Sequence, residues 1–428
     1  MNYRVIFRTL GAVLNIESAC MLLPMICALC YKDADSLVIF LICTMLCLIP
    51  GIILSHIKPK HKTMYAKEGF ITVALTWIFI SIMGALPFVL SGCIPSFIDA
   101  LFETVSGFTT TGASILTDIE ALPKPYLFWR SFTHWIGGMG VLVFLVALLH
   151  LSGGSNMHLI RAESPGPSVS KLVPKVRQTA KILYLIYIGM TVIQTILMLL
   201  GGTSLFDSLI LAFGTAGTGG FAARNTSMTD YSPYIQTVIT VFMILFGINF
   251  SLYYLALTCK FRTIFKSDEV KAYILIIVAA ALIISINCRS YFPDFTTSLR
   301  HGFFQTASII TTTGFTTTDF NLWPALSKTI LVILMFIGAC AGSTGGGIKV
   351  SRILILLKAV KHEVRLSAHP NITNKITLNG KTVDSETVRA VCVYTVVFFI
   401  LFAGSLLVIS LDNFDFTTNF TSVATTMN

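Results

Sequence analysis

The sequence has 428 residues, of which 54% are hydrophobic and only 12% are charged, and its mean hydropathy is +0.80. These values lie outside the range of soluble globular proteins. The net charge of +10 could suggest a nucleic-acid-binding protein, but the basic residues stand between apolar stretches and not along an aromatic-lined face, so we expect no nucleic-acid partner. The composition therefore predicts an all-α polytopic membrane protein surrounded by lipid.

Several apolar stretches approach the roughly 20 residues that a helix needs to cross a bilayer. We predict nine spans, at 11–30, 36–55, 69–90, 127–151, 182–201, 235–258, 272–287, 325–341 and 391–411. The first stretch is unlike a signal peptide, because it contains Glu17 and leads directly into the second. We therefore expect two extra helices before the remainder of the fold.

Lysine and arginine residues gather in four of the connections. Because cytoplasmic loops carry an excess of these residues, we expect all four connections and the N-terminus to be cytoplasmic. The four groups are Lys58, Lys60, Lys62 and Lys67; Arg161, Lys171, Lys175 and Arg177; Lys260, Arg262, Lys266 and Lys271; and Lys358, Lys361 and Arg365.

Three outer segments, 91–125, 202–232 and 290–323, each lie between a pair of predicted spans. They are too apolar for exposed loops and too short for two further spans. We predict that each forms a short re-entrant helix followed by irregular backbone. A membrane tolerates such backbone only where it lines a polar cavity or is buried in protein.

The outer segments repeat one another. Residues 108–114 read Phe-Thr-Thr-Thr-Gly-Ala-Ser, 216–222 read Ala-Gly-Thr-Gly-Gly-Phe-Ala, and 310–316 read Ile-Thr-Thr-Thr-Gly-Phe-Thr. One such run would be typical of a turn in a polar loop. Three copies at regular places between paired spans instead indicate an internal repeat with a shared function.

Aspartates occupy equivalent positions in two of the copies. Asp99 and Asp207 each stand thirteen residues before the aligned glycine, where we expect them to cap the N-terminus of a short helix. The third copy has His301 at this position, so Ser298 or Asp294 would cap instead.

A fourth copy begins at Asp415, and the sequence stops at Asn428 before an aligned glycine. We therefore expect the sequence to be part of a longer chain with a fourth repeat. The predicted segments are residues 1–66 for the extra helices, 67–176 for repeat 1, 177–268 for repeat 2, 269–384 for repeat 3 with a cytoplasmic linker, and 385–428 for the start of repeat 4.

The residues of the repeat suit a dehydrated potassium ion. Such an ion needs several oxygen ligands, and four backbone segments that point their carbonyls inward supply them in layers. Glycine adopts the backbone angles that turn a carbonyl toward the axis, and threonine adds a hydroxyl oxygen. We therefore predict a K⁺ filter at the repeated segments that contain Gly112, Gly220 and Gly314.

A glycine-rich run interrupts the segment 325–361, which as one helix would extend about 55 Å, against a hydrocarbon core of about 30 Å. We expect the segment to break at the run 342–347. The hypothesis is that Gly345, Gly346 and Gly347 form a loop across the ion path, and that Lys349 adds an electrostatic barrier to cations. The alternative is a hinge that only lets two helices pack, with Lys349 reaching the inner membrane surface.

These motifs resemble those of the Trk/Ktr/HKT potassium transporter family, and of its TrkH-like branch in particular. Besides the filter segments, the matching residues are His134–Gly140, Arg161–Pro167 and Gly338–Lys349. The resemblance implies a pseudo-fourfold pore in one chain, a homodimer in the bacterial inner membrane, and a cytoplasmic TrkA-like subunit that binds a nucleotide, NAD or ATP/ADP. It implies no covalently bound cofactor. Carried over residue by residue, the resemblance implies that the K⁺ filter uses Thr110, Thr111, Gly112, Thr218, Gly219, Gly220, Thr312, Thr313 and Gly314. The chain departs from the pattern at Gly219, where the other copies have threonine.

The resulting prediction is potassium uptake across the cytoplasmic membrane through a carbonyl filter, gated by the loop, regulated by the partner subunit, and with or without coupling to H⁺ or Na⁺. We expect no enzyme, because the sequence shows no metal-ligand cluster, nucleophile elbow or nucleotide-binding glycine loop. The alternative is a secondary transporter for another small solute. That class predicts an inverted repeat, whereas these copies run in the same direction.

Overall fold

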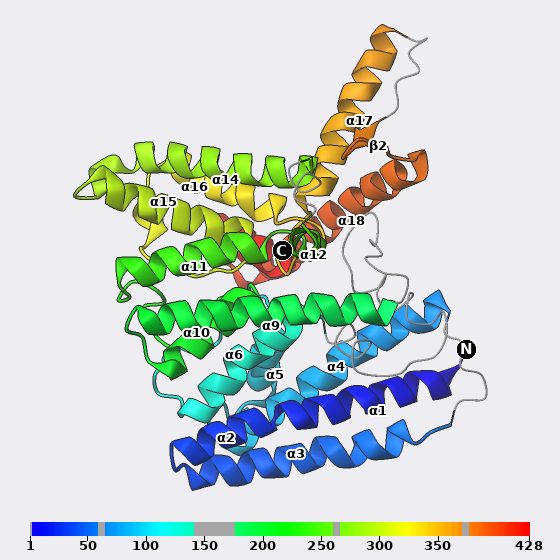
Figure 1. The fold of residues 1–428 in the computed structure, drawn as a ribbon, viewed down its shortest axis with the longest axis vertical. Helices are drawn as coiled ribbons and strands as arrows, with labels where there is room; N and C mark the ends of the chain where they lie inside the picture. The colour runs from blue at the N-terminus through cyan, green and yellow to red at the C-terminus, as the bar shows by residue number, and fades with distance from the viewer. Residues whose placement is uncertain (1, 59–64, 141–175, 260–265, 370–375) are drawn as a thin grey trace. The chain divides into compact units, whose positions relative to one another are not determined.

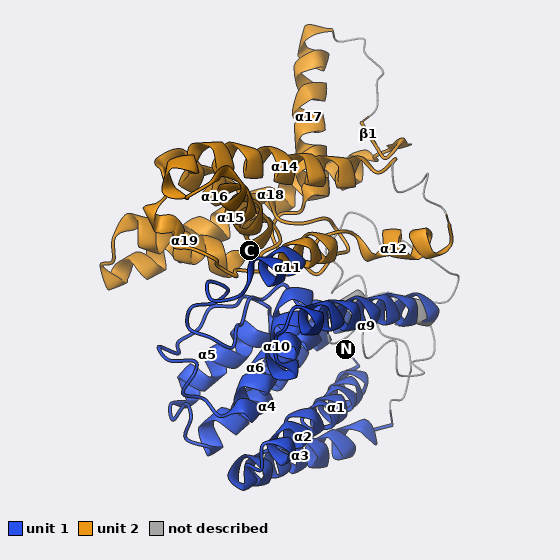
Figure 2. Ribbon diagram, turned by 60° about the vertical axis from the view of Figure 1, so that its left-hand side comes forward, with its two compact units in different colours: residues 1–165, 169–238 blue, residues 166–168, 239–428 orange. Residues whose placement is uncertain are grey.

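A computed structural model describes residues 2–58, 65–140, 176–259, 266–369 and 376–428 (Figure 1). Apart from one short β hairpin, the regular structure in these residues is helical, as predicted. The described residues form two compact units, coloured separately in Figure 2: unit 1 extends to Val238 and unit 2 begins at Ile239.

Unit 1 contains the two extra helices and the first two predicted filter segments. Its elements are α1 (Tyr3–Cys20), α2 (Leu22–Cys30), α3 (Ala34–Ser55), α4 (Ala66–Leu90), α5 (Phe97–Phe108), α6 (Lys124–Gly138), α9 (Val176–Leu200), α10 (Leu205–Ala216) and the first turns of α11 (Pro233–Phe246).

Unit 2 contains the third predicted filter segment and the glycine-rich run. After the rest of α11, its elements are α12 (Phe250–Leu257), α14 (Asp268–Asn287), η1 (Arg289–Tyr291), α15 (Phe295–Ile310), η2 (Phe320–Leu322), α16 (Ala325–Ile337), α17 (Val350–Ala368), β1 (Thr377–Leu378), β2 (Lys381–Thr382), α18 (Ser385–Ile409), η3 (Ser410–Asp412) and α19 (Phe416–Met427).

Six helical segments in the described residues are long and apolar enough to cross a membrane. They are Tyr3–Cys30, Ala34–Ser55, Lys67–Leu90, Gln178–Leu200, Asp268–Asn287 and Ser385–Asp412. Each overlaps one of the predicted spans, which confirms a multi-pass architecture. A seventh predicted span, 127–151, is described only in part: α6 ends at Gly138, and residues 141–175 lie outside the described ranges.

Two predicted spans are not continuous helices. The stretch 235–258 bends by 94° between α11 and α12, where the side chain of Asn249 accepts a hydrogen bond from the backbone N–H of Ser251 (2.9 Å) and so caps α12. The stretch 325–341 ends as a helix at Ile337. The apolar composition was recognised correctly, but composition gives no information about a break of a few residues.

Some of the predicted residues lie outside the described ranges. They are Lys60, Lys62, Arg161, Lys171, Lys175, Lys260, Arg262 and the motif 161–167.

Close backbone packing joins α1 and α3 in unit 1, and the two helices run side by side in Figure 1. A Cβ atom added to Gly11 would lie 2.8 Å from the carbonyl oxygen of Gly51 and would overlap the backbone nitrogen of Ser55. Small residues at such crossings let two helices approach closely in a membrane, where van der Waals contact drives their association.

A small polar assembly in unit 2 joins α14, α17 and the β hairpin. The Oδ2 atom of Asp268 accepts hydrogen bonds from the Lys358 Nζ atom (3.2 Å) and from the backbone N–H of Asn379 (3.0 Å). Asn379 and Gly380 form the hairpin turn and have positive φ angles of 54° and 73°, as a type I′ turn requires. Asp268 thus fastens the hairpin to the N-terminus of α14.

Candidate ion-binding site

The three aligned segments share one backbone conformation. Each threonine two residues before the aligned glycine has positive φ, and so does the glycine itself. The angles are 58° and 76° at Thr110 and Gly112, 54° and 77° at Thr218 and Gly220, and 58° and 85° at Thr312 and Gly314. Positive φ is unusual for a β-branched residue. Its recurrence at the same position in each copy therefore confirms that the sequence repeat is a structural repeat.

The hydrogen bonds that form this turn are also repeated. In each copy the aligned glycine and the residue before it donate their backbone N–H groups to one carbonyl, that of the residue six positions before the glycine. The acceptors are Ser106 (3.0 and 3.5 Å), Gly214 (2.9 and 3.3 Å) and Ser308 (2.8 and 3.3 Å). Within the described residues, the carbonyls of the nine predicted filter residues accept no hydrogen bond. These oxygens are therefore available as ligands.

Copies 1 and 3 also share their side-chain contacts. The hydroxyl pairs Thr109–Thr111 and Thr311–Thr313 are each 2.8 Å apart, and the hydroxyls of Ser106 and Ser308 donate to the carbonyls of Ala113 (2.6 Å) and Phe315 (2.7 Å). Copy 2 has glycine at the corresponding positions 214, 217 and 219. Its segment must therefore be held by other groups.

The structure explains why copy 2 departs from the threonine pattern at Gly219. A Cβ atom at this position would overlap the imidazole ring of His134 on α6. A Cβ atom at Gly112 would in turn overlap the carbonyl oxygen of Gly219. Unit 1 therefore brings the predicted residues of copies 1 and 2 into direct contact, and this approach requires glycine at both positions.

The helix caps differ from the prediction in two copies. The side chains of Ser96 and Ser204, and not those of Asp99 and Asp207, accept the capping hydrogen bond, and the backbone N–H groups of the two aspartates donate it (3.4 and 3.0 Å). A serine suits this position as well as an aspartate does. Both aspartates lie in the first helical turn, where a negative charge interacts favourably with the positive end of the helix dipole.

In the third copy, the cap is Asp294, one of the two predicted residues. It accepts hydrogen bonds from the backbone N–H of Thr297 (3.1 Å) and from its hydroxyl (2.6 Å). These bonds hold the pKa of the Asp294 carboxyl below its ordinary value. Asp415 caps α19 in the same way through Thr418, so the predicted fourth copy begins with the expected short helix.

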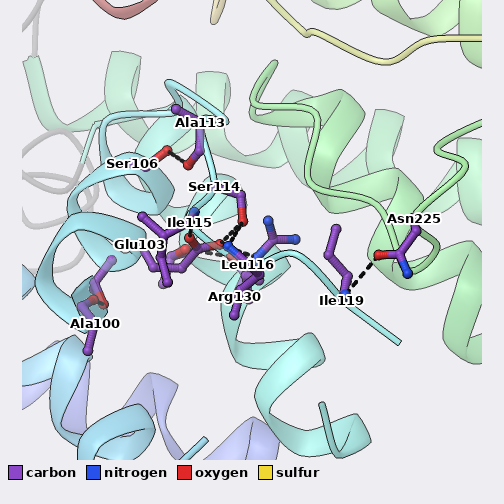
Figure 3. A network of polar contacts seen from close by, with 12 residues as sticks. Ala100, Glu103, Ser106, Ala113, Ser114, Ile115, Leu116, Ile119, Arg130 and Asn225 are labelled. Carbon is purple, nitrogen blue, oxygen red and sulfur yellow. Dashed lines mark hydrogen bonds and ion pairs between the residues drawn. The ribbon is translucent and has the colours of Figure 1, made fainter. Parts of the chain in front are cut away.

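A buried ion pair supports the first segment. On α5, the Oε1 atom of Glu103 lies 2.5 Å from the Nε atom of Arg130 on α6, and both side chains are fully shielded from solvent. Glu103 also accepts hydrogen bonds from the hydroxyl of Ser114 (3.0 Å) and the backbone N–H of Ile115 (3.1 Å). Figure 3 shows these groups converging on the carboxylate. Glu103 therefore fastens the backbone that directly follows the first predicted filter segment.

Arg130 extends this support to the second segment. Its guanidinium group faces the ring of Phe221, the residue that follows Gly220. His134, one helical turn along α6, stacks on the same ring. An aromatic ring attracts a cation on its face, most strongly where water is excluded.

Sequence reasoning missed Glu103, Arg130 and Phe221. The available indication was a pair of opposite charges, each within an otherwise apolar stretch, because such residues in a membrane protein usually pair with one another.

The outer ends of copies 1 and 2 are also joined. Asn225 accepts a hydrogen bond from the backbone N–H of Ile119 (2.8 Å), a contact drawn in Figure 3. Its side-chain amide donates to Asp118 (2.8 Å), and its backbone N–H donates to Glu120 (3.2 Å). These bonds link the two irregular segments directly.

In unit 2, the glycine-rich run lies directly against the third segment. The predicted break is confirmed, since the residues between Ile337 and Val350 are not helical. The backbone N–H of Gly346 donates to the hydroxyl of Thr312 (2.7 Å), and a Cβ atom at Gly345 would lie 3.0 Å from the carbonyl oxygen of Thr311.

Lys349 folds back onto the loop. Its side chain is only 2% exposed, and its Nζ atom donates a hydrogen bond to the carbonyl oxygen of Gly345. The hinge alternative expects the Lys349 side chain to reach the inner membrane surface. The observed hydrogen bond to the loop differs from that expectation. The structure thus places Gly345 and Gly346 against the third repeated segment, while Lys349 is joined to this segment through its hydrogen bond to Gly345.

Comparisons with known proteins identify relatives over the whole chain. The model of the TrkH family, described as cation transport proteins, matches residues 37–428. The Trk system potassium uptake protein TrkH of Salmonella typhimurium is 35% identical, with 100% of this chain and 90% of that protein aligned, and TrkG of Escherichia coli strain K12 is 32% identical over 100% and 89%. The crystal structure of the potassium transporter TrkH from Vibrio parahaemolyticus superposes with a TM-score of 0.89 at 32% identity, covering 99% of this chain and 89% of that one.

Proposed function

Because the chain belongs to the TrkH family of cation transport proteins, we propose that it takes up potassium ions across the cytoplasmic membrane. The family consists of transporters and not of enzymes. Backbone carbonyls of the repeated segments act as the ligands of the ion. The relatives whose names specify potassium uptake support this choice of ion.

The repeated backbone turn is the observation that carries the proposal. In each copy, a threonine and a glycine with positive φ follow the C-terminus of a short helix, and the carbonyls between them accept no hydrogen bond within the described residues. Free carbonyls in a fixed orientation can replace the water shell of K⁺. The negative end of each short helix dipole further lowers the energy of a cation in its vicinity.

The glycine-rich loop is the proposed gate. Its contact with Thr312 supports this role, because a loop bonded to a filter residue lies where it can obstruct the ion path. The charge of Lys349 adds a barrier to cations. Movement of the loop away from the third segment removes both obstacles.

The proposed orientation follows from the basic connections, with the N-terminus on the cytoplasmic side of the bacterial inner membrane. The chain acts as a homodimer with a cytoplasmic, nucleotide-binding subunit of the TrkA type, which regulates the gate. The described basic residues of α17, Lys358, Lys361 and Arg365, directly follow the loop in sequence and support cytoplasmic control of it. Coupling of the flux to H⁺ or Na⁺ is a further part of the proposal that flux measurements test.

Uptake of ⁸⁶Rb⁺ into proteoliposomes containing the full-length protein tests the proposal. We expect uptake above that of protein-free liposomes, with competition by K⁺ at lower concentrations than by Na⁺. An imposed pH or Na⁺ gradient that changes the final Rb⁺ level would establish coupling. Absence of Rb⁺ uptake, or equal competition by K⁺ and Na⁺, would contradict a potassium filter.

A further inference from the structure

The two arms of the glycine-rich loop come together at a neck. We use this name for residues 337–341 on one arm and 348–351 on the other. The backbone N–H of Lys349 donates to the carbonyl of Ile337, and that of Val350 donates to the carbonyl of Ala339, both at 3.0 Å. The loop can therefore move as a whole only if the neck opens or shifts.

A side chain from another helix holds both arms of this neck. Glu269 stands in the first turn of α14, and its side chain is 6% exposed. Its Oε1 atom accepts one hydrogen bond from the backbone N–H of Ala341 (2.7 Å) and another from the backbone N–H of Ser351 (3.2 Å). The first donor precedes the glycine-rich run and the second follows it.

The two donors belong to different kinds of structure. Ser351 is the second residue of α17, and the first N–H groups of a helix have no acceptor within the helix. Ala341 lies in the irregular arm, where its N–H likewise has no ladder partner. One buried carboxylate thus satisfies a donor on each arm, and hydrogen bonds to a charged acceptor are stronger than those between neutral groups.

We propose that Glu269 is a clamp that keeps the loop closed, a positioning residue that touches no permeating ion. This inference rests on the proposed gating role of the loop. While the carboxylate holds Ala341 and Ser351 together, the glycines remain against Thr312. When it releases one arm, the neck opens and the loop leaves the third segment.

Asp268 provides a matched local control. It precedes Glu269 directly, but its side chain points to the hairpin and to Lys358, and it is 39% exposed. Replacing Asp268 with asparagine therefore changes the charge of the same helical turn without touching the neck. We expect Asp268→Asn to leave the neck closed.

Cys340 provides a direct measure of neck opening. It lies between Ala339 and Ala341 and is 0% exposed. In the full-length protein with its other cysteines replaced, the rate at which a water-soluble methanethiosulfonate reagent modifies Cys340 reports how often the neck opens. This measurement does not depend on ion flux.

We expect Glu269→Leu, which removes both hydrogen bonds, to raise the Cys340 modification rate about tenfold or more and to raise ⁸⁶Rb⁺ flux in the same direction. Glu269→Gln should raise the modification rate less than Glu269→Leu does, because the amide oxygen still accepts both bonds, although without the charge that strengthens them. Ser351→Pro removes one donor at a helix position that tolerates proline, and should have a smaller effect in the same direction. This variant leaves Glu269 in place, so it tests the clamp even if Glu269→Leu does not fold.

The possible outcomes separate the clamp from the gate. Unchanged Cys340 modification in folded Glu269→Leu and Ser351→Pro overturns the clamp, whatever the flux. Faster modification without higher flux supports the clamp and overturns the proposed gate. If Glu269→Gln opens the neck as much as Glu269→Leu does, charge and not hydrogen bonding holds the loop, and the clamp as proposed is wrong.

Discussion

The guanidinium carbon of Arg130 lies 3.4 Å from the centre of the Phe221 ring, directly beside the second predicted filter segment. On the same ring, the imidazole of His134 stacks with its centroid 4.0 Å from that of Phe221. Phe221 is 2% exposed. Both partners come from α6, so this helix fixes the residue that follows Gly220.

The first prediction is that Phe221→Leu lowers the preference for K⁺ over Na⁺. The substitution keeps an apolar side chain but removes a desolvated cation–π contact of about 2 kcal/mol, so the second segment loses part of its support. Competition of each ion against ⁸⁶Rb⁺ uptake measures the preference. Phe40→Leu is the matched control, because Phe40 is equally buried in the core of unit 1 and lies outside the filter segments. Equal preferences in the two variants would contradict the prediction.

The second prediction contrasts two buried carboxyl groups in unit 1. Glu103→Gln should destabilise the protein by about 3–5 kcal/mol, because it leaves the buried guanidinium of Arg130 without its counter-charge. Glu17 is 4% exposed, and neither of its carboxyl oxygens has a hydrogen-bond partner within the described residues. Glu17→Gln should therefore leave stability unchanged or raise it. Thermal unfolding in detergent measures both, and a similar loss in both variants would contradict the assigned role of the ion pair.

The third prediction ranks two filter glycines. Gly112→Ser should impair K⁺ selectivity more than Gly314→Ser, because a Cβ atom at Gly112 overlaps the Gly219 carbonyl, whereas one at Gly314 meets no atom within 4 Å. Both glycines have positive φ, so both substitutions strain the backbone. Relative uptake of K⁺ and Na⁺ measures the effect. Wild-type selectivity in both variants would refute the filter assignment.

The fourth prediction concerns Lys349. Lys349→Ala should raise ⁸⁶Rb⁺ flux several-fold, because it removes a buried positive charge and the hydrogen bond that ties the side chain to Gly345. Deletion of residues 345–347 should act in the same direction. Lys328→Ala, at a lysine that donates to the carbonyl of Asn321 outside the neck, is the control and should leave flux unchanged. Lower flux in both loop variants, at matched incorporation, would favour the packing hinge over the gate.

The periodic features of the fold could be predicted from the sequence. Apolar stretches predicted the six long spans, because every helix that crosses lipid needs an apolar surface. The repeated Thr-x-Gly pattern predicted the three equivalent turns, because each turn needs the same residue types at the same spacing. Helix length also predicted a break in the segment 325–361, since one helix of that length exceeds the membrane, although the helix ends at Ile337, before the predicted run 342–347.

Contacts between residues far apart in the chain could not be predicted, because they produce no repeated pattern in the sequence. Glu269 is one acid at the end of an apolar stretch, and nothing in its neighbourhood indicates Ala341 or Ser351, which follow it by 72 and 82 positions. The caps were wrong for a different reason. Ser96 and Asp99 are both residue types that cap helix N-termini. Which of them caps α5 depends on where the helix begins within a range of three residues, and composition alone does not determine that start.

The three predicted filter threonines with positive φ bear on efforts to engineer this protein. A β-branched residue in the left-handed region costs about 1 kcal/mol or more relative to a relaxed backbone, so Thr110, Thr218 and Thr312 each weaken the fold that contains them. A screen for heat resistance would favour glycine or asparagine at these positions. Because these threonines belong to the proposed filter, we expect the selected variants to survive purification better and to discriminate ions less well. Thermostability would then be a misleading criterion for choosing a version of this transporter to study.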